Sequence, residues 1–510
     1  MRIGPGYSGA YRSLLMILAV YLGCFFLTAC HGGGGGVSVS VAVSPATASV
    51  VTGTSIPLSA KVSGTTNWSI TWTVNGVAGG NSTVGTINTV GVYTAPSSVP
   101  TPSSVQITAT SVADTTKSAT ATITVLPLSL AGPGGGYFGN FTTAGTMISA
   151  RANHTANLLA NGKVLIAGGL GSGGVAIAAA ELYSPAFGTY STAGVMATPR
   201  AYHTATLMTN GKVLIAGGVD NSNTPLASAE LFDPDTGKFT STGSMATARA
   251  FHTATLLMNG KVLISGGNAN GDLAAGSPLS SAEIYDPVTG LFTHAAALTV
   301  ARYYHTASML PNGKVLLAGG IGVGGAKLPD AELYDPGTDT FTATGSMLVN
   351  ATLDTGRWLH SAILLGNGTV LTAGGDMGTH AALTGYLNTG QLYAPAAGTY
   401  SDIIRFLDAP TNTIVDPTSV LADPRGAHSA ATRADGLVLF DGGIGGNTPG
   451  GATFLASAEL YHPAGTNFSA TGSMHAARAN HTSTILPNGK ILVLGGNNAG
   501  AFLSSAELYQ

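Results

Sequence analysis

One cassette recurs seven times between Ala150 and Gln510, and it constrains the fold more than any other feature of the chain. Its clearest copy begins TARAFHTATLLMNGKVLISGG at Thr247 and, after a variable loop, continues SAEIYDPVTGLFTHAAAL. Every copy opens with Arg-x-x-His, and successive histidines are 49, 49, 53, 55, 68 and 53 residues apart. Periods of this length are typical of propellers and repeat arrays.

Each cassette carries two hairpin signals. The first is a pair of short apolar runs joined by Asn-Gly, as at Asn259-Gly260, with Asp435-Gly436 in the sixth copy. This dipeptide predicts a hairpin with a type I′ turn, whose two central residues both need positive φ. The second signal is D-P-x-T-G-x-F, as in residues 286–292. Four strands per unit, repeated many times, predict a radial array that leaves only short sheet edges.

The two ends of the repeat region predict how the ring closes. The last copy reaches Ala506-Glu507-Leu508-Tyr509-Gln510 without a fourth strand. Ahead of the first copy, residues 139–147 match the fourth strand of other copies, such as residues 239–245. We therefore predict an all-β fold in which residues 136–510 form a seven-bladed β-propeller, with an N-terminal strand completing the last blade.

The apolar strand of each copy ends in a Gly pair, as at Gly266-Gly267, and a later strand carries an aromatic residue such as Tyr285. On these features, residues 136–510 resemble the kelch repeat family of β-propellers. The resemblance implies a scaffold that most often binds a partner, here a protein or a polysaccharide, through the loops of one rim.

The first thirty residues are predicted to direct export. Arg2 and Arg12 supply positive charge, and residues 14–27 form an apolar run too short to span a bilayer. The following LTAC, ending at Cys30, resembles the cleavage box of bacterial lipoproteins, which implies a lipid on Cys30 and a membrane anchor. His31 suits an outer-membrane or cell-surface destination. The alternative is an ordinary secretory signal with an incidental cysteine.

Three further segments precede the propeller. Residues 31–36 form a Gly-rich tether, which would be flexible. Residues 37–126 alternate Val, Thr and Ser in strand-like runs and resemble bacterial immunoglobulin-like domains, which implies a small β-sandwich. We expect Trp68 and Trp72 to lie in its core or between its sheets, with a role in ligand binding as the alternative. Residues 127–135 form a Pro/Gly linker.

Charge is scarce: Asp, Glu, Lys and Arg make up 8% of the chain, and the net charge is −3. The absence of a basic patch argues against nucleic acid as a partner. The two cysteines are Cys24, inside the predicted leader, and Cys30, so we expect no disulfides. No cofactor and no metal are predicted.

The few charged residues occupy repeat positions. All six glutamates share one position, where the fifth copy has Gln391, and seven of the eleven arginines share another. One Arg and one Glu per blade indicate a buried structural pair, which needs hydrogen bonds to be tolerated. The pairs of repeat residues are Arg151 and Glu181, Arg200 and Glu230, Arg249 and Glu283, Arg302 and Glu332, Arg357 and Gln391, Arg425 and Glu459, and Arg478 and Glu507.

The seven repeat histidines raise the alternative of a metal site. Side chains at equal radius on separate blades do not converge on one ion, so we expect each to donate a hydrogen bond to a neighbouring loop. They are His154, His203, His252, His305, His360, His428 and His481.

Residues that break the repeat are better candidates for function, because loops on a rigid scaffold carry binding sites. The rim opposite the short turns is longest around the fourth to sixth blades, in residues 348–355, 376–390 and 402–424. An aromatic ring beside carboxylates and an arginine would suit a glycan or a peptide; loops that only pack on each other are the alternative. The candidate ligand-binding residues are Tyr303, Asp354, Trp358, Asp376, His380, Arg405 and Asp408.

The sequence is compatible with three functions. The first is a surface-anchored recognition protein that binds a protein or polysaccharide at the propeller rim. The second is an extracellular carbohydrate-active enzyme, for which no spacing of carboxylates singles out a catalytic pair. A copper-radical oxidase of the galactose oxidase type is excluded, because its Tyr–Cys crosslink needs a cysteine that the propeller lacks. The third is a passive structural or adhesive surface protein.

Overall fold

The computed structural model describes residues 38–53, 55–126, 139–272, 276–347, 356–378, 385–403, 407–408, 413–414, 420–445 and 453–510. The predicted leader at 1–30, the tether at 31–36 and the linker at 127–135 lie outside these residues, and so does Cys30. Within the described part of the chain, no helix is long and apolar enough to cross a membrane.

Residues 40–126 form a domain of two packed β-sheets with a separate strand pair. One sheet has the order β2-β11-β10-β5-β6, the other β3-β9-β8-β7, and β1 pairs with β4. Its core includes Val74, Ile107 and Ile123, all without exposed surface, and Trp72 at 6% exposure. The strands are β1 (Ser40–Ser44), β2 (Thr47–Val51), β3 (Ser55–Pro57), β4 (Ser59–Ser63), β5 (Ile70–Val74), β6 (Val77–Ala78), β7 (Gly80–Asn81), β8 (Gly85–Ile87), β9 (Val92–Thr94), β10 (Ser104–Ser111) and β11 (Ser118–Leu126).

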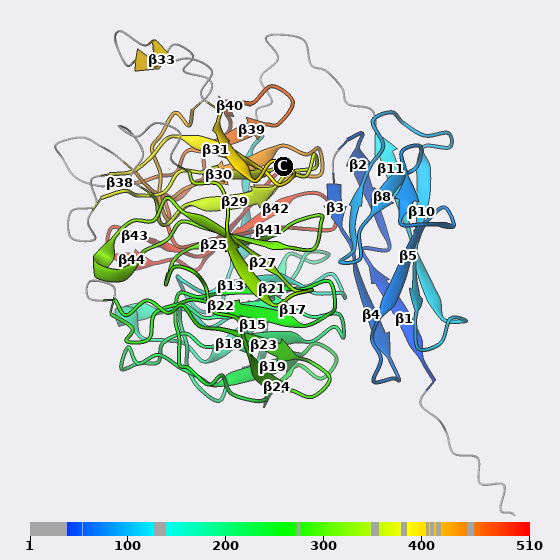
Figure 1. Ribbon diagram of the computed structural model, residues 1–510, viewed down its shortest axis with the longest axis horizontal. Helices are drawn as coiled ribbons and strands as arrows, with labels where there is room; N and C mark the ends of the chain where they lie inside the picture. Colours follow the sequence, from blue (N-terminus) through cyan, green and yellow to red (C-terminus); the bar gives the residue numbers. More distant parts are fainter. Residues whose placement is uncertain are drawn as a thin grey trace, which may run out of the picture. The chain divides into compact units, whose positions relative to one another are not determined.

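The repeat region forms seven four-stranded antiparallel sheets, which confirms the predicted propeller (Figure 1). The first three blades are β13 (Thr155–Leu158), β14 (Val164–Ala167), β15 (Ala179–Ser184), β16 (Thr189–Val195); β17 (Thr204–Leu207), β18 (Val213–Ala216), β19 (Ala229–Asp233), β20 (Lys238–Ser241); and β21 (Thr253–Leu256), β22 (Val262–Ser265), β23 (Ala282–Asp286), β24 (Leu291–Ala295). The next three are β25 (Thr306–Met309), β26 (Val315–Ala318), β27 (Ala331–Asp335), β28 (Thr340–Ala343); β29 (Ser361–Leu364), β30 (Val370–Ala373), β31 (Gly390–Ala394), β32 (Thr399–Asp402); and β35 (Ser429–Thr432), β36 (Val438–Asp441), β39 (Ala458–His462), β40 (Asn467–Ala470).

The seventh blade is built from both ends of the region, as predicted. It contains β41 (Thr482–Ile485), β42 (Ile491–Leu494) and β45 (Ser505–Tyr509), and its outer strand is β12 (Phe141–Thr146). Strand β12 pairs antiparallel with β45, so that Phe141 lies opposite Tyr509 and their rings are 4.9 Å apart. The first strand of the ring therefore closes its last sheet.

Every residue of the second strand of each blade is buried, because both faces of that strand are covered, and most of these residues are apolar. In β18, Val213 and Ile215 pack with Leu165 of the first blade, whereas Leu214 packs with Val262 of the third. The alternation of side chains along a strand thus sends successive residues to opposite neighbours. Full burial of each such side chain contributes about 1.5–3 kcal/mol, so these strands hold the blades together.

The Asn-Gly hairpins exist, but the predicted type I′ turn is wrong in the propeller. In the first blade Gly162 has φ 78°, whereas Asn161 is not among the residues with positive φ. The Gly162 N–H donates to the Leu159 carbonyl at 2.9 Å, and the Asn161 side chain accepts the Lys163 N–H at 3.1 Å. These contacts define a three-residue loop with a glycine bulge. Among the described residues, the predicted turn occurs at Asn75-Gly76 in the first domain, with φ of 47° and 80°.

The Gly pairs join each blade to the next. A Cβ on the first glycine would lie 2.5–2.7 Å from the carbonyl oxygen of the repeat arginine in the following blade. The second glycine donates its N–H to that same oxygen at 2.8–2.9 Å in all seven blades. At the closure, Gly496 of the seventh blade donates to Arg151 of the first. Only glycine permits this approach at the positive φ that both positions adopt.

Candidate functional site

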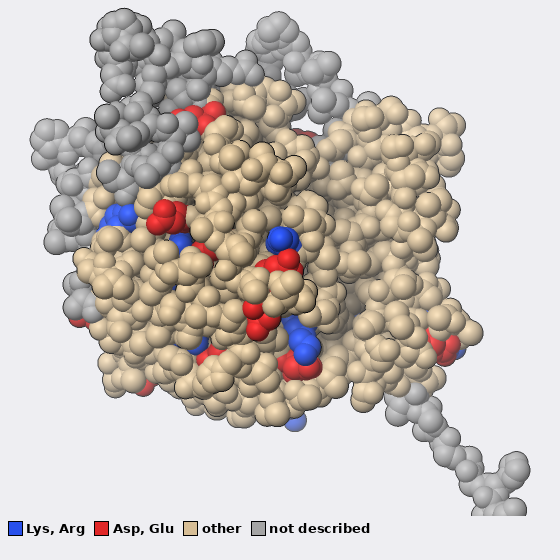
Figure 2. All heavy atoms as spheres, viewed as in Figure 1, with Lys and Arg blue, Asp and Glu red and all other residues tan. Residues whose placement is uncertain are grey.

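The two faces of the propeller differ in kind. One face carries the uniform hairpin turns, where exposed Lys–Asp pairs repeat in consecutive blades: Lys212–Asp233, Lys261–Asp286 and Lys314–Asp335. Figure 2 shows charged side chains as isolated blue and red neighbours on a largely uncharged surface. The face with the uniform hairpin turns is called the short-turn face.

The opposite face, here called the variable face, carries the connections between the second and third strands of each blade. These 2–3 loops contain the 3-10 turns η1 (Ser172–Gly174) and η2 (Val323–Gly325) and two small hairpins. The hairpins pair β37 (Ile444–Gly445) with β38 (Thr453–Phe454), and β43 (Asn497–Asn498) with β44 (Ala501–Phe502). Figure 1 shows β38, β43 and β44 on the same side of the ring.

The repeat arginines lie inside the blades, without exposed surface. Arg249 is representative: its Nη1 donates to the carbonyls of Gly266 and Ser281 at 2.8 and 2.9 Å, and its Nη2 to Glu283 Oε1 at 2.8 Å. Glu283 also accepts the N–H of Ala246 at 2.8 Å. Burial lowers the pKa of Arg249, and the Glu283 charge opposes that shift. Each pair therefore fixes the end of strand 2, the start of strand 3 and the segment entering the blade.

The fifth blade departs from this scheme, because Gln391 replaces the glutamate. Arg357 Nη2 is 3.5 Å from Gln391 Oε1, against 2.6–2.9 Å for Arg–Glu pairs in the other blades. The Gln391 amide donates instead to the Met347 carbonyl at 2.5 Å and to Asp402 at 2.8 Å. This blade keeps the arginine but has no buried carboxylate at the repeat position.

The repeat histidines each face the preceding blade, and in six of the seven the partner is a hydroxyl on a strand, where we had expected a loop. His203 Nε2 lies 3.1 Å from Thr155 Oγ1 on β13, and five others make the same contact at 2.9–3.2 Å. Among the residues that the structure describes, no group of three or more His, Cys, Asp or Glu could hold a metal ion. Each repeat histidine thus forms a contact at a different blade interface.

Burial of these imidazoles makes the fold sensitive to acid. Desolvation, and next the Arg200 charge, lower the pKa of His203 to about 3. The unfolded chain binds this proton near pH 6.5, so stability is complete above that pH and falls as the pH drops toward 3. We expect denaturant unfolding between pH 4 and 6 to lose about 1.4 kcal/mol per pH unit for each such histidine. His203→Gln should reduce the slope by that amount, and an unchanged slope would contradict the assignment.

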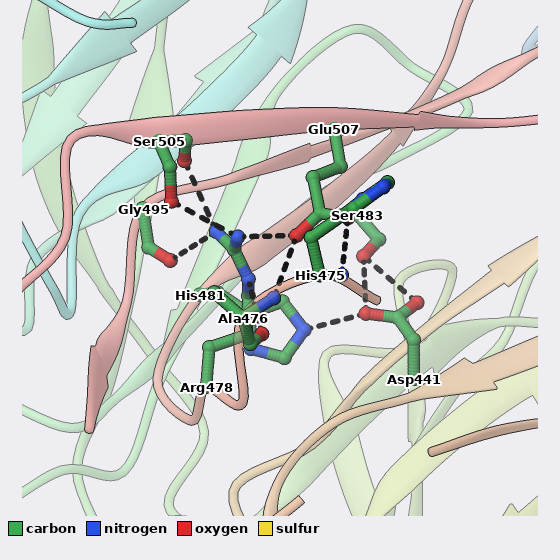
Figure 3. Close-up of polar contacts among 9 residues, drawn as sticks. All are labelled: Asp441, His475, Ala476, Arg478, His481, Ser483, Gly495, Ser505 and Glu507. Atoms are coloured by element: carbon green, nitrogen blue, oxygen red, sulfur yellow. Dashed lines mark hydrogen bonds and ion pairs between the residues drawn. The ribbon is translucent and has the colours of Figure 1, made fainter. Parts of the chain in front are cut away.

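One histidine has a different partner. His481 Nε2 lies 2.5 Å from Asp441 Oδ1, and Ser483 Oγ donates to both oxygens of the same carboxylate at 3.0 Å (Figure 3). Both His481 and Asp441 have side chains without exposed surface. The serine and the histidine both contact the aspartate, and solvent does not reach the His481–Asp441 pair. These three residues therefore stabilise the interface between the sixth and seventh blades.

The residue directly before each repeat histidine adopts a left-handed backbone. φ lies between 52° and 55° at all seven: Asn153, Tyr202, Phe251, Tyr304, Leu359, Ala427 and Asn480. Such a conformation costs a non-glycine residue about 1–2 kcal/mol. Hydrogen bonds between neighbouring blades offset it; Phe251 N–H, for example, donates to the Tyr202 carbonyl at 3.3 Å, and Asn153 N–H to Asn480 at 2.9 Å. The pre-histidine residues therefore form a ring at the mouth of the propeller.

Four aromatic side chains line part of this mouth, and we call them the aromatic row: Tyr202, Phe251, Tyr304 and Trp358. Their successive ring centroids are 4.5, 4.5 and 5.4 Å apart. Lys327 Nζ lies 5.2 Å from the Trp358 ring centroid at one end of the row. The remaining pre-histidine residues of the ring are Leu, Ala and Asn, so the mouth is aromatic on one side only.

The structure places three of the predicted ligand-binding residues in the interior of the mouth. Trp358 is 2% exposed, Tyr303 1% and Asp376 0%. Trp358 and Asp376 are joined by backbone hydrogen bonds of 3.1 and 2.8 Å. Of the others, Asp354, His380 and Arg405 lie outside the described residues, and Asp408 is described only as backbone of β33 (Leu407–Asp408).

Sequence reasoning missed Tyr202, Phe251 and Tyr304. The available signal was the variability of the position directly before the constant His. Around the ring this position is Asn, Tyr, Phe, Tyr, Leu, Ala and Asn. A position that varies inside a fixed motif is one where the repeat does not require a particular side chain.

A hollow of about 360 Å³ opens between the 2–3 loops of the first three blades, and we call it the three-blade hollow. Tyr202 and Phe251, the first two members of the aromatic row, contribute to its lining. Its other lining residues are Leu170, Gly174, Val219, Asp220, Asn221, Asn223, Gly271 and Asp272. The hollow joins aromatic and polar groups on the variable face, away from the longest loops.

Comparison with known proteins agrees with this architecture. The Kelch motif matches residues 199–246 and 249–299, in the second and third blades. No curated protein matches the chain. Among solved structures, a fungal alcohol oxidase of the AA5 family, in complex with copper, is similar over 74% of this chain and 76% of its own, with 18% identity and a TM-score of 0.56. The chain is thus a β-propeller with kelch motifs, and the likeness to the oxidase is one of fold.

The residues of this chain do not fit a copper centre like the one that the oxidase resemblance would imply. The only cysteines, Cys24 and Cys30, precede the propeller. Each repeat histidine is committed through Nε2 to a partner at its own blade interface, such as Thr155 for His203 or Asp441 for His481. The described side chains therefore offer no converging set of ligands for the metal.

Proposed function

We propose that the chain is an exported, lipid-anchored recognition protein whose propeller binds a protein or polysaccharide ligand on the variable face. The observation that carries the proposal is the contrast between the two faces. The short-turn face repeats one turn from blade to blade, whereas the variable face has loops of unequal length, an aromatic row and the three-blade hollow. Ligand sites are concave and combine apolar surface with a few placed polar groups.

The rigid ring supports this role. Seven Gly–Arg hydrogen bonds and the buried Arg–Glu pairs fix each 2–3 loop at its base. A loop held in one conformation loses little entropy when it binds, and this favours affinity. The anchor part of the proposal rests on the sequence LTAC that ends at Cys30 and on the glycines that follow.

The proposal can be tested by blocking one face at a time. Protein that begins at His31 contains no cysteine, so a single introduced thiol can carry a bulky polyethylene glycol maleimide. Asn221→Cys labels the variable face, and Val288→Cys, at a residue that is 61% exposed, labels the short-turn face. Each protein would be applied to a glycan array and to immobilised cell-envelope proteins.

We expect the label at position 221 to reduce ligand capture at least about ten-fold, because the polymer excludes a macromolecule from the loops around the hollow. The label at position 288 should leave capture unchanged. Three results would overturn the assignment to the variable face. They are an equal loss of ligand capture with both labels, a loss with the label at position 288 alone, and capture that neither label affects.

A further inference from the structure

The three-blade hollow is held in shape by hydrogen bonds between its own loops. Asp220 Oδ1 accepts the N–H groups of Ser222 and Thr224 at 2.8 and 2.9 Å. Asn223 Nδ2 donates to the Gly271 carbonyl at 3.0 Å, which ties the loop of the second blade to that of the third. Asn268 Nδ2, in a residue without exposed surface, donates to the Asp272 carbonyl at 2.7 Å. The hollow is therefore preorganised.

The charge of the hollow is negative. Asp220 and Asp272 contribute two carboxylates, and its lining contains neither Lys nor Arg. In the described propeller most other carboxylates have a cationic partner, such as Arg249 for Glu283 or Lys261 for Asp286. Asp220 has no such ion pair among the residues described, and the two hydrogen bonds of its turn use only Oδ1. An anionic hollow in a chain so poor in charge selects for a cation.

The aromatic rings narrow the choice of cation. A guanidinium group is planar, stacks on aromatic faces and donates two parallel hydrogen bonds to a carboxylate. An ammonium group is more strongly hydrated and gains less from the rings. A neutral sugar could stack on Tyr202 and Phe251 but would leave the charge of Asp220 without compensation. The combination of rings and carboxylates thus favours guanidinium over the other two.

We propose that the three-blade hollow binds the guanidinium group of an arginine side chain presented by a protein partner. The proposal rests on the recognition function proposed above and names the chemistry of its ligand. Asp220 Oδ2 and Asp272 would accept the N–H groups, and Tyr202 and Phe251 would contact the plane of the cation and its methylene chain.

Ligand-observed NMR titration of the full chain tests this with four probes. They are N-acetyl-arginine amide, its neutral isostere N-acetyl-citrulline amide, N-acetyl-lysine amide, and methyl β-glucoside. We expect arginine to bind more tightly than lysine, citrulline to bind at least about ten-fold more weakly than arginine, and added salt to weaken arginine binding. Equal binding of citrulline and arginine, preferential binding of the sugar, or no binding of arginine would each overturn the proposal.

Matched variants locate the site. Asp220→Asn removes the charge but keeps an Oδ1 acceptor for the turn, and it should weaken arginine binding about three- to ten-fold. Tyr202→Leu should also weaken it, by removing a ring. Asp286→Asn makes the same charge change on the short-turn face and should have no effect. Arginine binding that resists Asp220→Asn as well as Asp286→Asn would place the arginine site elsewhere.

The two proposals can fail separately. If the label at position 221 still reduces ligand capture but Asp220→Asn does not change it, recognition by the variable face stands and the arginine site is rejected. If neither label affects any captured ligand, the recognition proposal itself is rejected.

Discussion

Replacing Arg249 with methionine should lower the free energy of unfolding of the propeller by about 3–5 kcal/mol. The change removes the cation from a buried pair and leaves the Glu283 carboxylate without charge compensation. It also leaves the carbonyls of Gly266 and Ser281 without the donor that now lies 2.8 and 2.9 Å away. Guanidinium unfolding followed by circular dichroism would measure the loss as a shift of the transition midpoint.

Two controls separate burial from charge in this prediction. Lys261→Met breaks an exposed pair with Asp286 in the same blade and should cost less than about 1 kcal/mol. The double variant with Arg249→Met and Glu283→Leu should recover part of the loss, because apolar groups then replace both charges. A single variant Arg249→Met as stable as Lys261→Met would show that the pair does not stabilise the blade.

The architecture was predictable because it depends on local patterns that are repeated. Four strand signals per cassette, seven cassettes and a spare strand at 139–147 give the blade number and the closure of the ring. The turn type was not predictable from Asn-Gly alone. A loop of three residues, of which only Gly162 has positive φ, connects the paired strands β13 and β14. The Asn-Gly dipeptide is compatible with this loop as well as with a type I′ turn.

The site was predictable only in part, because it depends on distances between residues of different blades. Tyr202, Phe251 and Tyr304 are about fifty residues apart in the chain, yet their rings are 4.5 Å apart. Loop length pointed to the fourth to sixth blades, where Trp358 and Asp376 are buried. The hollow instead lies between the 2–3 loops of the first three blades, which come together because the blades are neighbours in the ring.

The seven interfaces also show which positions tolerate change. The Arg carbonyl and the Gly pair are constant in all seven blades, because the backbones meet there. Side chains near them differ from blade to blade: Gln391 stands where the other blades have a glutamate, and Asp441 stands where the first blade has Ala167. The backbone contacts between blades should therefore be sensitive to mutation.

Gly217→Ala tests this directly. A Cβ at this position, where φ is 62°, would lie 2.5 Å from the Arg249 carbonyl oxygen and 2.7 Å from His252 Cε1, both in the next blade. Left-handed strain of about 1–2 kcal/mol and overpacking of about 1–3 kcal/mol add to an expected loss of about 2–5 kcal/mol. The Gly218 N–H bond to Arg249, now 2.9 Å, would also lengthen.

Gly237→Ala provides the matched control. Gly237 has nearly the same φ, 65°, but no atom lies within 4 Å of its Cβ position. Alanine there should cost only the backbone strain, about 1–2 kcal/mol. The difference between the two variants, measured by the same unfolding experiment, isolates the contact between blades. Equal losses would mean that the second and third blades can separate enough to admit a methyl group, and the close approach at the Gly pairs would then not be what fixes the ring.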